Sequence, residues 1–211
     1  MKPRFLAAGL IVALVPALWV AQWIVTKNRP QERPNVLMFL TDDQPSQSLS
    51  VMPKTTAWFG RSSTRFTNSF VTTPLCCPSR ASIFTGRYSH NHGVWTNSEV
   101  QQVADLDQRT TFQYQLGKAG YRTALFGKYL NAWEVALDPP FFDEWAIFSH
   151  SSTANYGQEE WNVDNEITTV EGYSSDLMGG RAEHLIRGEV VARRGALVVC
   201  AALLLAAVWA V

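Results

Sequence analysis

The sequence predicts an α/β fold in which a mixed, mostly parallel sheet lies between helices. Three observations favour this class: an apolar run at 35–40 that ends in polar residues, a helical segment at 112–118, and an apolar run at 121–126. A helix that joins two buried strands is the usual connection of a parallel sheet. With 211 residues the chain can form one domain with a core, yet it is short for an enzyme built on a large sheet. We therefore expect a partial domain.

The first strand is predicted from the continuous apolar run Asn35–Leu40, which follows Pro34. Such a run is typical of a parallel strand that is buried on both faces. Asp42 and Asp43 follow almost directly, at the edge where open α/β sheets bind ligands. A lone pair of acids can also begin a turn or cap a helix. The residues alone leave both interpretations open.

A helix is predicted between Pro74 and Gly86. Pro78 suits the first turn of a helix and Gly86 suits its end, because proline lacks an N–H donor and glycine accepts a positive φ. Cys76 then lies at the helix N-terminus. The free N–H groups and the dipole at that end favour an anion, and they also lower the pKa of a thiol.

A second helix and strand follow along the chain. Thr110 or Thr111 can cap a helix over 112–118, and residues 121–126 return as a strand. Lys128 comes just after the end of that strand. The two predicted strands therefore both end in charged residues, on what should be the same edge of the sheet.

The N-terminus has the pattern of an exported protein. Residues 1–25 are predicted to be a secretory signal or a membrane-anchor helix, because Lys2 and Arg4 precede a long uncharged run. Residues 26–32 are polar and contain a proline, so we expect a linker. The folded domain is predicted over 33–187. We expect it to be extracellular, or anchored in a membrane with the catalytic domain outside.

The C-terminal segment 188–211 is expected to diverge from this domain. Its apolar part is only marginally long enough for a transmembrane helix, and Arg193 and Arg194 precede it, where a stop-transfer segment would have basic residues after it. A final helix of the domain is predicted over 174–186, just before this segment. We interpret the tail as a possible transmembrane helix or as a sequence unrelated to the domain.

Charge and cysteine content exclude some classes of function. Eighteen basic and eighteen acidic residues cancel, so the net charge does not favour a nucleic-acid partner. The three cysteines are Cys76, Cys77 and Cys200, which do not form a disulfide framework. Neighbouring cysteines can bond to each other only with strain. From the residues alone, the pair could be a thiol nucleophile, a redox couple or half of a metal site.

The segment Cys76–Arg87 reads Cys-Cys-Pro-Ser-Arg-Ala-Ser-Ile-Phe-Thr-Gly-Arg. It resembles the signature of the sulfatase family, in which a Cys, any residue, then Pro, Ser and Arg precede Thr-Gly. In that family the first cysteine is converted to formylglycine by a formylglycine-generating enzyme. The resemblance assigns this modification to Cys76 and leaves Cys77 as the variable position.

Three further segments resemble sulfatases in the same chain order, so that the resemblance covers roughly residues 33–187. The first strand with Asp42 and Asp43 is similar to the part of the family that binds calcium, with Mg²⁺ as an alternative. The segment 120–131 resembles the second signature, whose lysine contacts the sulfate and corresponds to Lys128. Many members have Trp-His after this lysine, whereas this chain has Tyr-Leu. The segment 173–176 is similar to the start of a later helix.

The resemblance implies an alkaline-phosphatase-like fold, incomplete here, and a nucleophile made from Cys76. An aldehyde hydrate supplies two hydroxyls on one carbon: one can attack sulfur, and the other can lose its proton to release sulfate. A cation held by Asp42, Asp43 and modified Cys76 lowers the pKa of the attacking hydroxyl. Arg80 and Lys128 are the other catalytic candidates, and each contact is worth about 2 to 4 kcal/mol in the transition state.

The variant with two cysteines, followed by His90 and His92, resembles the branch of N-acetylglucosamine-6-sulfatases and extracellular heparan sulfatases. This branch implies a sulfated carbohydrate substrate, such as 6-sulfated N-acetylglucosamine in a glycosaminoglycan. Lys128, His90 and His92 are the candidates for substrate binding. The two histidines could equally have only solvent or backbone partners.

A complete sulfatase site needs more residues than this chain supplies. Calcium takes six to eight oxygen ligands, and the family provides further ligands and a second lysine and histidine later in the chain. We therefore expect this polypeptide alone to have weak or no activity. One alternative function is an inactive, truncated sulfatase remnant anchored in a membrane. Another is a phosphate-ester hydrolase of the same superfamily, which has Ser or Thr where Cys76 stands.

Overall fold

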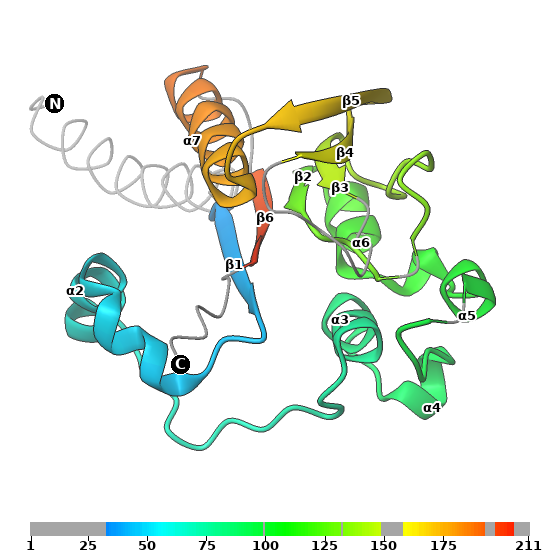
Figure 1. Ribbon diagram of the computed structural model, residues 1–211, viewed down its shortest axis with the longest axis horizontal. Helices are drawn as coiled ribbons and strands as arrows, with labels where there is room; N and C mark the ends of the chain where they lie inside the picture. Colours follow the sequence, from blue (N-terminus) through cyan, green and yellow to red (C-terminus); the bar gives the residue numbers. More distant parts are fainter. Residues whose placement is uncertain (1–32, 99, 132, 149–157, 193–196, 205–211) are drawn as a thin grey trace, which may run out of the picture. The chain divides into compact units, whose positions relative to one another are not determined.

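The computed structural model describes residues 33–98, 100–131, 133–148, 158–192 and 197–204. From Pro34 onward they belong to one compact unit. The signal or anchor and the linker predicted for residues 1–32 lie outside the described residues. Figure 1 shows the elements, which are β1 (Val36–Asp42), η1 (Ser46–Val51), α2 (Pro53–Ser62), α3 (Cys76–Thr85), α4 (Ser89–His92), α5 (Val100–Ala104), η2 (Gln108–Thr110), α6 (Phe112–Lys118), β2 (Arg122–Gly127), β3 (Glu144–Phe148), β4 (Gln158–Val163), β5 (Glu166–Glu171), α7 (Ser174–Ala192) and β6 (Leu197–Leu204).

The sheet has the strand order β1-β6-β2-β3-β4-β5. β1, β6, β2 and β3 pair in parallel, whereas β3–β4 and β4–β5 are antiparallel. The prediction of a mixed, mostly parallel sheet with helices is therefore confirmed. The parallel arrangement brings the carboxyl ends of β1 and β2 to the same edge, which is where Asp42 and Lys128 lie.

Residues 197–204, the described part of the C-terminal apolar run, form the strand β6, where the sequence had suggested a possible transmembrane helix. β6 lies between β1 and β2, with Val198 beside Val36 on one side and Thr123 on the other. A central parallel strand is covered on both faces, so it has the same uninterrupted apolar composition as a membrane segment. No helix in the described part of the chain is long and apolar enough to cross a membrane.

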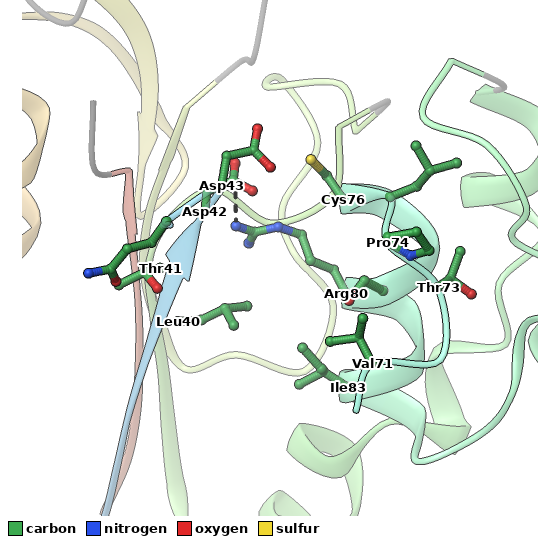
Figure 2. A pocket seen from close by; sticks show the side chains of 13 residues that line it. Leu40, Thr41, Asp42, Asp43, Val71, Thr73, Pro74, Cys76, Arg80 and Ile83 are labelled. Atoms are coloured by element: carbon green, nitrogen blue, oxygen red, sulfur yellow. Dashed lines mark ion pairs between the residues drawn. The ribbon is translucent and has the colours of Figure 1, made fainter. Parts of the chain in front are cut away.

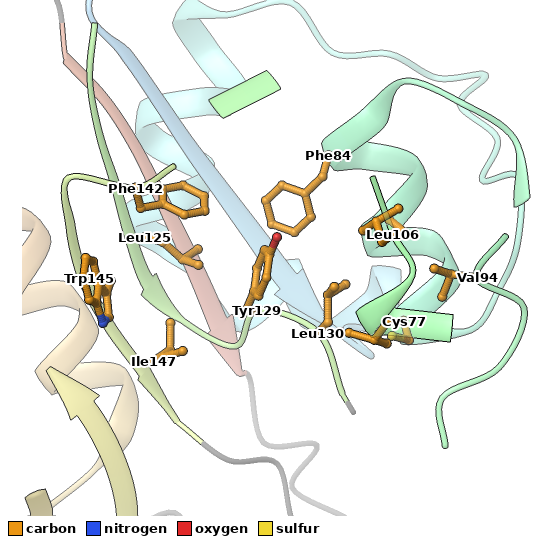
Figure 3. Close-up of a cluster of buried hydrophobic side chains, with 12 residues drawn as sticks. Cys77, Phe84, Val94, Leu106, Leu125, Tyr129, Leu130, Phe142, Trp145 and Ile147 are labelled. Atoms are coloured by element: carbon orange, nitrogen blue, oxygen red, sulfur yellow. The ribbon is translucent and has the colours of Figure 1, made fainter. Parts of the chain in front are cut away.

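Buried side chains pack on both faces of the sheet. Because side chains alternate along a strand, Leu125 of β2 faces one cluster while Ala124 and Phe126 face the other. The second cluster includes residues of α7, such as Met178. The first cluster joins the start and middle of α3 to β2 and β3 (Figure 3), and its buried members are Cys77, Ala81, Phe84, Val94, Val103, Leu106, Leu125, Tyr129, Leu130, Phe142, Trp145 and Ile147. Packing against this cluster fixes the helix that carries Cys76.

Candidate active site

The helix α3 begins at Cys76 and presents that residue beside the sheet edge. Leu75 is extended and precedes the helix, and the Ser79 N–H donates the first intrahelical bond to the Leu75 carbonyl at 2.9 Å. At the other end Gly86 adopts a φ of +66°, which glycine accepts without strain. The predicted helix between Pro74 and Gly86 is therefore confirmed. Cys76 is half-buried, and it lies where β1 ends.

Three potential ligands meet in front of α3. One carboxylate oxygen from each of Asp42 and Asp43 and the Cys76 sulfur lie within 4.8 Å of one another. They line a cavity of about 330 Å³ together with Arg80, and Figure 2 shows the side chains around it. One wall is apolar and contains Leu40, Val71, Leu75 and Ile83. The two strand-end acids and the first cysteine of the pair therefore share one pocket.

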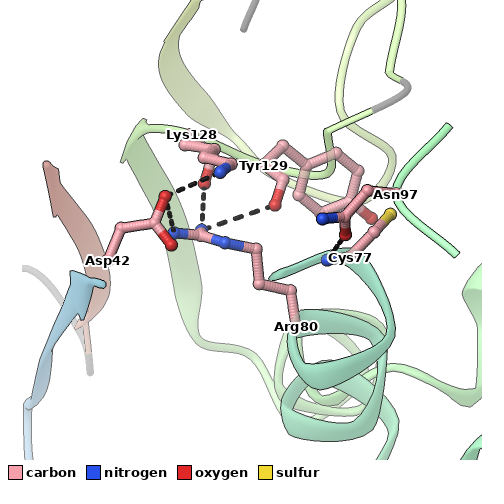
Figure 4. A network of polar contacts seen from close by, with 6 residues as sticks. All are labelled: Asp42, Cys77, Arg80, Asn97, Lys128 and Tyr129. Carbon is pink, nitrogen blue, oxygen red and sulfur yellow. Dashed lines mark hydrogen bonds and ion pairs between the residues drawn. The ribbon is translucent and has the colours of Figure 1, made fainter. Parts of the chain in front are cut away.

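Two cations surround the Asp42 carboxylate (Figure 4). The Lys128 Nζ donates a hydrogen bond to Asp42 Oδ2 at 2.6 Å, and the Arg80 Nη2 lies 3.8 Å from the same oxygen. Both cationic side chains are almost completely buried, at 1% and 3% exposure. The Arg80 Nη1 also donates to the Lys128 carbonyl at 2.6 Å and to the Tyr129 carbonyl at 3.5 Å. Arg80 thus fixes the backbone that carries Lys128.

The surroundings shift the pKa values of Asp42 and Cys76 in opposite directions. Burial alone would raise the pKa of Asp42, but the hydrogen bond from Lys128 and the charges of Arg80 and Lys128 outweigh it, so the pKa is lowered. Burial raises the pKa of the Cys76 thiol, and the charges of Asp42 and Asp43 raise it further against the effect of Lys128. This direction is opposite to the low thiol pKa that the position at a helix N-terminus led us to expect. As an unmodified thiol, Cys76 is a poor nucleophile near neutral pH.

The two histidines of the HNH sequence have different surroundings, and neither is part of the cavity lining. His92 is buried; its Nε2 lies 2.9 Å from Ser82 Oγ, and its Nδ1 accepts a hydrogen bond from the Val94 N–H at 3.2 Å. His90 is exposed and stacks on the Tyr88 ring, with the ring centroids 5.7 Å apart. The internal partners of His92 fit the alternative of a structural role. Contact of either ring with substrate remains a prediction.

Two contacts near the site were not predicted from the sequence. The Cys77 N–H donates to Asn97 Oδ1 at 2.8 Å, although the two residues are 20 positions apart. The Tyr129 hydroxyl donates to Gln108 Oε1 at 2.7 Å inside the core. Burial raises the pKa of the Tyr129 hydroxyl, so this group remains protonated. The first contact has no local sequence signal, since nothing near Asn97 marks it as a partner of α3.

The donor set fits a hard divalent cation in part. Asp42 and Asp43 offer carboxylate oxygens, which calcium and magnesium prefer. The sulfur of Cys76 is a soft ligand and does not suit these ions, whereas an oxygen at the same position would. Calcium takes six to eight oxygens, so these three residues of the described chain supply only part of a full shell.

Comparison with known proteins identifies the family. The sequence model of the sulfatase family matches residues 34–194, which include β1, α3, Lys128 and α7. The chain belongs to the sulfatase family. The resemblance of Cys76–Arg87 to the sulfatase signature is therefore confirmed at the level of the family.

Several relatives are named as sulfatases of sugars or extracellular sulfatases. A Caenorhabditis elegans protein named as an extracellular sulfatase Sulf-1 homolog is 44% identical over 157 residues, or 70% of this chain and 22% of the relative. The N-acetylglucosamine-6-O-sulfatase of Bacteroides thetaiotaomicron is 30% identical over 174 residues, which covers 79% of this chain and 30% of the relative. This chain therefore spans less than a third of the length of either protein.

A solved structure shares the fold. It is a protein in complex with its substrate D-glucosamine-2-N,6-O-disulfate, and it is 26% identical with a TM-score of 0.67. The match covers 81% of this chain and 34% of the solved chain. The α/β fold described above is thus the fold of part of a sulfatase domain.

Proposed function

We propose that this chain carries the nucleophile half of a site that hydrolyses sulfate esters of sugars. The observation that supports the proposal most directly is the shared pocket of Asp42, Asp43 and Cys76, with Lys128 and Arg80 next to the Asp42 carboxylate. Two anions and two cations around one reactive position suit an ester that is itself an anion. The cations attract the sulfate, and the acids can hold a metal ion.

Cys76 is the position at which we propose conversion to formylglycine by a formylglycine-generating enzyme. The hydrated aldehyde supplies an oxygen nucleophile in place of a thiol whose pKa is raised. It also replaces the soft sulfur by an oxygen, which completes a donor set of three oxygen-bearing residues suited to Ca²⁺, with Mg²⁺ as the alternative. The bound cation would supply charge neutralisation and a lower pKa of the nucleophile.

Arg80 and Lys128 are proposed to stabilise negative charge during the reaction. Lys128 lies within the same ion-pair network as Asp42, so its ammonium can contact a sulfate oxygen with a small movement of the side chain. Arg80 holds both the Asp42 carboxylate and the backbone at Lys128, so it orients these two groups. Contacts of this kind are worth about 2 to 4 kcal/mol each when they act on the transition state.

The substrate class is proposed to be a sulfated carbohydrate, with 6-sulfated N-acetylglucosamine of glycosaminoglycans as the first candidate. Support comes from the names of the relatives and from the glucosamine disulfate that a structural neighbour binds. The same names support export of this chain, for which residues 1–25 would serve as a signal or as a membrane anchor. His90 and His92 are proposed as substrate contacts with less support than Lys128, because neither lines the cavity and Lys128 contacts Asp42.

The chain by itself is proposed to have weak or no sulfatase activity. Among the His, Cys, Asp and Glu side chains of the described residues, three meet at the site, which is fewer than the six to eight ligands that calcium takes. The remaining alternative is an inactive relative of sulfatases. A phosphate-ester hydrolase is less well supported, because the superfamily members with that activity have Ser or Thr at the nucleophile and this chain has Cys76.

The experiment is co-expression with a formylglycine-generating enzyme, followed by mass spectrometry of the tryptic peptide that ends at Arg80. Formylglycine at Cys76 supports the sulfatase assignment, and an intact cysteine contradicts it. Hydrolysis of 4-methylumbelliferyl sulfate and of N-acetylglucosamine 6-sulfate is then measured for the full chain and for Cys76→Ala. Turnover at rates typical of enzymes, lost in the variant, would show that the chain alone is active and that our expectation of weak activity is wrong.

A further inference from the structure

The two neighbouring cysteines have different environments, although they are adjacent on one helix. Cys76 is half-buried and faces Asp42 and Asp43, whereas Cys77 is fully buried in the core cluster. Successive residues of a helix point about 100° apart. A rotation of the first turn by one residue would therefore bring Cys77 to the position that faces the acids and would move Cys76 away from them.

The first turn of α3 has few hydrogen bonds of its own that could fix its rotation about the helix axis. Leu75, the residue before the helix, has no side-chain acceptor for the first N–H groups. Pro78 has no N–H, and the Ser79 N–H is bonded to the Leu75 carbonyl. The Cys77 N–H, however, donates to the Asn97 side chain at 2.8 Å. Asn97 thus supplies from a distant loop the acceptor that an N-cap residue normally supplies from the preceding position.

The segment that carries Asn97 is itself fixed by hydrogen bonds. The Gln102 Oε1 accepts from the Trp95 N–H at 2.7 Å and from the Thr96 N–H at 3.3 Å. These bonds join the loop just before Asn97 to α5. The acceptor is therefore held in place by a second element of the fold, so its position does not depend on α3 alone.

A further bond ties the beginning of the same segment back to α3. His92 accepts from the Val94 N–H through Nδ1, and its Nε2 contacts Ser82 on α3. Residues 92–97 are therefore connected to α3 at two places, one turn before the helix end and at its first turn. This closed set of contacts can set the rotation of α3 about its axis.

We infer that Asn97 is a positioning residue that selects Cys76 over Cys77 as the thiol facing the acid pair. The residue acts through the backbone of Cys77 and does not touch the reacting atoms. Its purpose in catalysis rests on the proposed function, whereas the selection of one thiol can be measured without any sulfatase activity. Asn97→Ala removes the acceptor, and Asn97→Asp keeps an oxygen at nearly the same place.

The test is limited alkylation of the full chain with unmodified cysteines by iodoacetamide, followed by fragment-ion assignment of the label to Cys76 or Cys77. In the native chain, labelling of Cys76 should greatly exceed that of Cys77. Asn97→Ala should lower the Cys76-to-Cys77 labelling ratio about fivefold, the effect expected from losing a helix cap. Asn97→Asp should keep the ratio within about twofold of the native value, because the acceptor is retained.

Two controls separate local positioning from general loss of stability. Ser98→Ala changes the exposed neighbour of Asn97 and should leave the ratio unchanged. Hydrogen exchange of β2 should remain slow in Asn97→Ala, because global unfolding would expose that central strand as well. An unchanged ratio in Asn97→Ala, or failure of Asn97→Asp to preserve it, would overturn the inference. Lack of formylglycine or of turnover would instead contradict the proposed function and leave this result intact.

Discussion

The ammonium of Lys128 lies 2.6 Å from the carboxylate of Asp42, although 86 positions separate the two residues in the sequence. Asp42 is the last residue of β1, and Lys128 directly follows β2. These strands are not neighbours, because β6 lies between them. The ion pair therefore bridges across the end of a strand and joins the two sequence motifs that flank the cavity.

Lys128→Met should lower the free energy of unfolding by about 3 kcal/mol, because removing one partner of a buried ion pair leaves the other charge in a low-dielectric site. Urea denaturation measures the change. The matched control is Arg187→Met, which breaks the exposed pair with Glu183 and should cost less than about 0.5 kcal/mol. Equal effects of the two substitutions would show that the Asp42–Lys128 pair adds no more than a surface pair.

His92 should make the chain less stable as the pH falls. Burial lowers the pKa of His92 below its ordinary value of about 6.5. As the pH falls, the unfolded chain therefore takes up the proton before the folded chain does. The contribution of His92 to stability is complete above the ordinary pKa of about 6.5, and it is lost as the pH falls from there through the lower pKa of the folded state. Protonation at Nδ1 would also remove the acceptor of the Val94 N–H.

The measurement is the free energy of unfolding from urea titrations between roughly pH 5 and 8. His92→Gln should flatten the pH dependence over this range. His90→Gln is the control, because His90 is exposed and the slope should persist in that variant. A native slope that survives in His92→Gln would refute the assignment to this ring.

Asp43→Asn should weaken cation binding about tenfold, because the affinity of an oxygen site follows the number of charged ligands. Terbium luminescence, sensitised by the aromatic residues, measures the binding, with calcium as competitor. Glu171→Gln, which removes an exposed acid of β5 outside the cluster, should leave the affinity unchanged. The same terbium signal in both variants would place the ion elsewhere.

Arg80→Lys should reduce sulfate-ester turnover about 100- to 1,000-fold in any assembly that contains this chain and is active. Lysine keeps the positive charge, but it cannot contact Asp42 and donate to the Lys128 carbonyl with a planar fork. The measurement is kcat/KM on 4-methylumbelliferyl sulfate, compared under identical conditions with the same assembly that contains Arg80. Full activity in Arg80→Lys would mean that charge alone suffices at this position.

Much of the site could be predicted because its signals are local. The apolar run before Asp42 marks β1, and Pro78 and Gly86 mark the start and end of α3. That Asp42 and Lys128 lie close together follows from the rule that parallel strands end at one edge of a sheet, whereas the meeting of the acids with Cys76 was implied by the resemblance to sulfatases. By contrast, the Asn97 contact depends on a loop 20 residues away, and no spacing in the sequence indicates it.

Strands β4 and β5, at the opposite end of the sheet from β1, were not predicted, for a different reason. β4 and β5 contain many polar residues, so they lack the apolar signal of a buried strand. Their turn carries the available signal: Asp164 and Asn165 have positive φ values of 49° and 75°, as tight hairpin turns require. β6 shows the opposite ambiguity, because an uninterrupted apolar run is compatible both with a central parallel strand and with a membrane segment.

The central place of β6 also has a consequence for how this molecule folds. Asp42, at the end of β1, and Lys128, just after β2, become neighbours only when β6 inserts between these two strands. Contacts between residues so far apart along the chain form slowly, because a large loop must close first. The geometry of the candidate site should therefore be among the last features to assemble, after the local helices and the β4–β5 hairpin have formed.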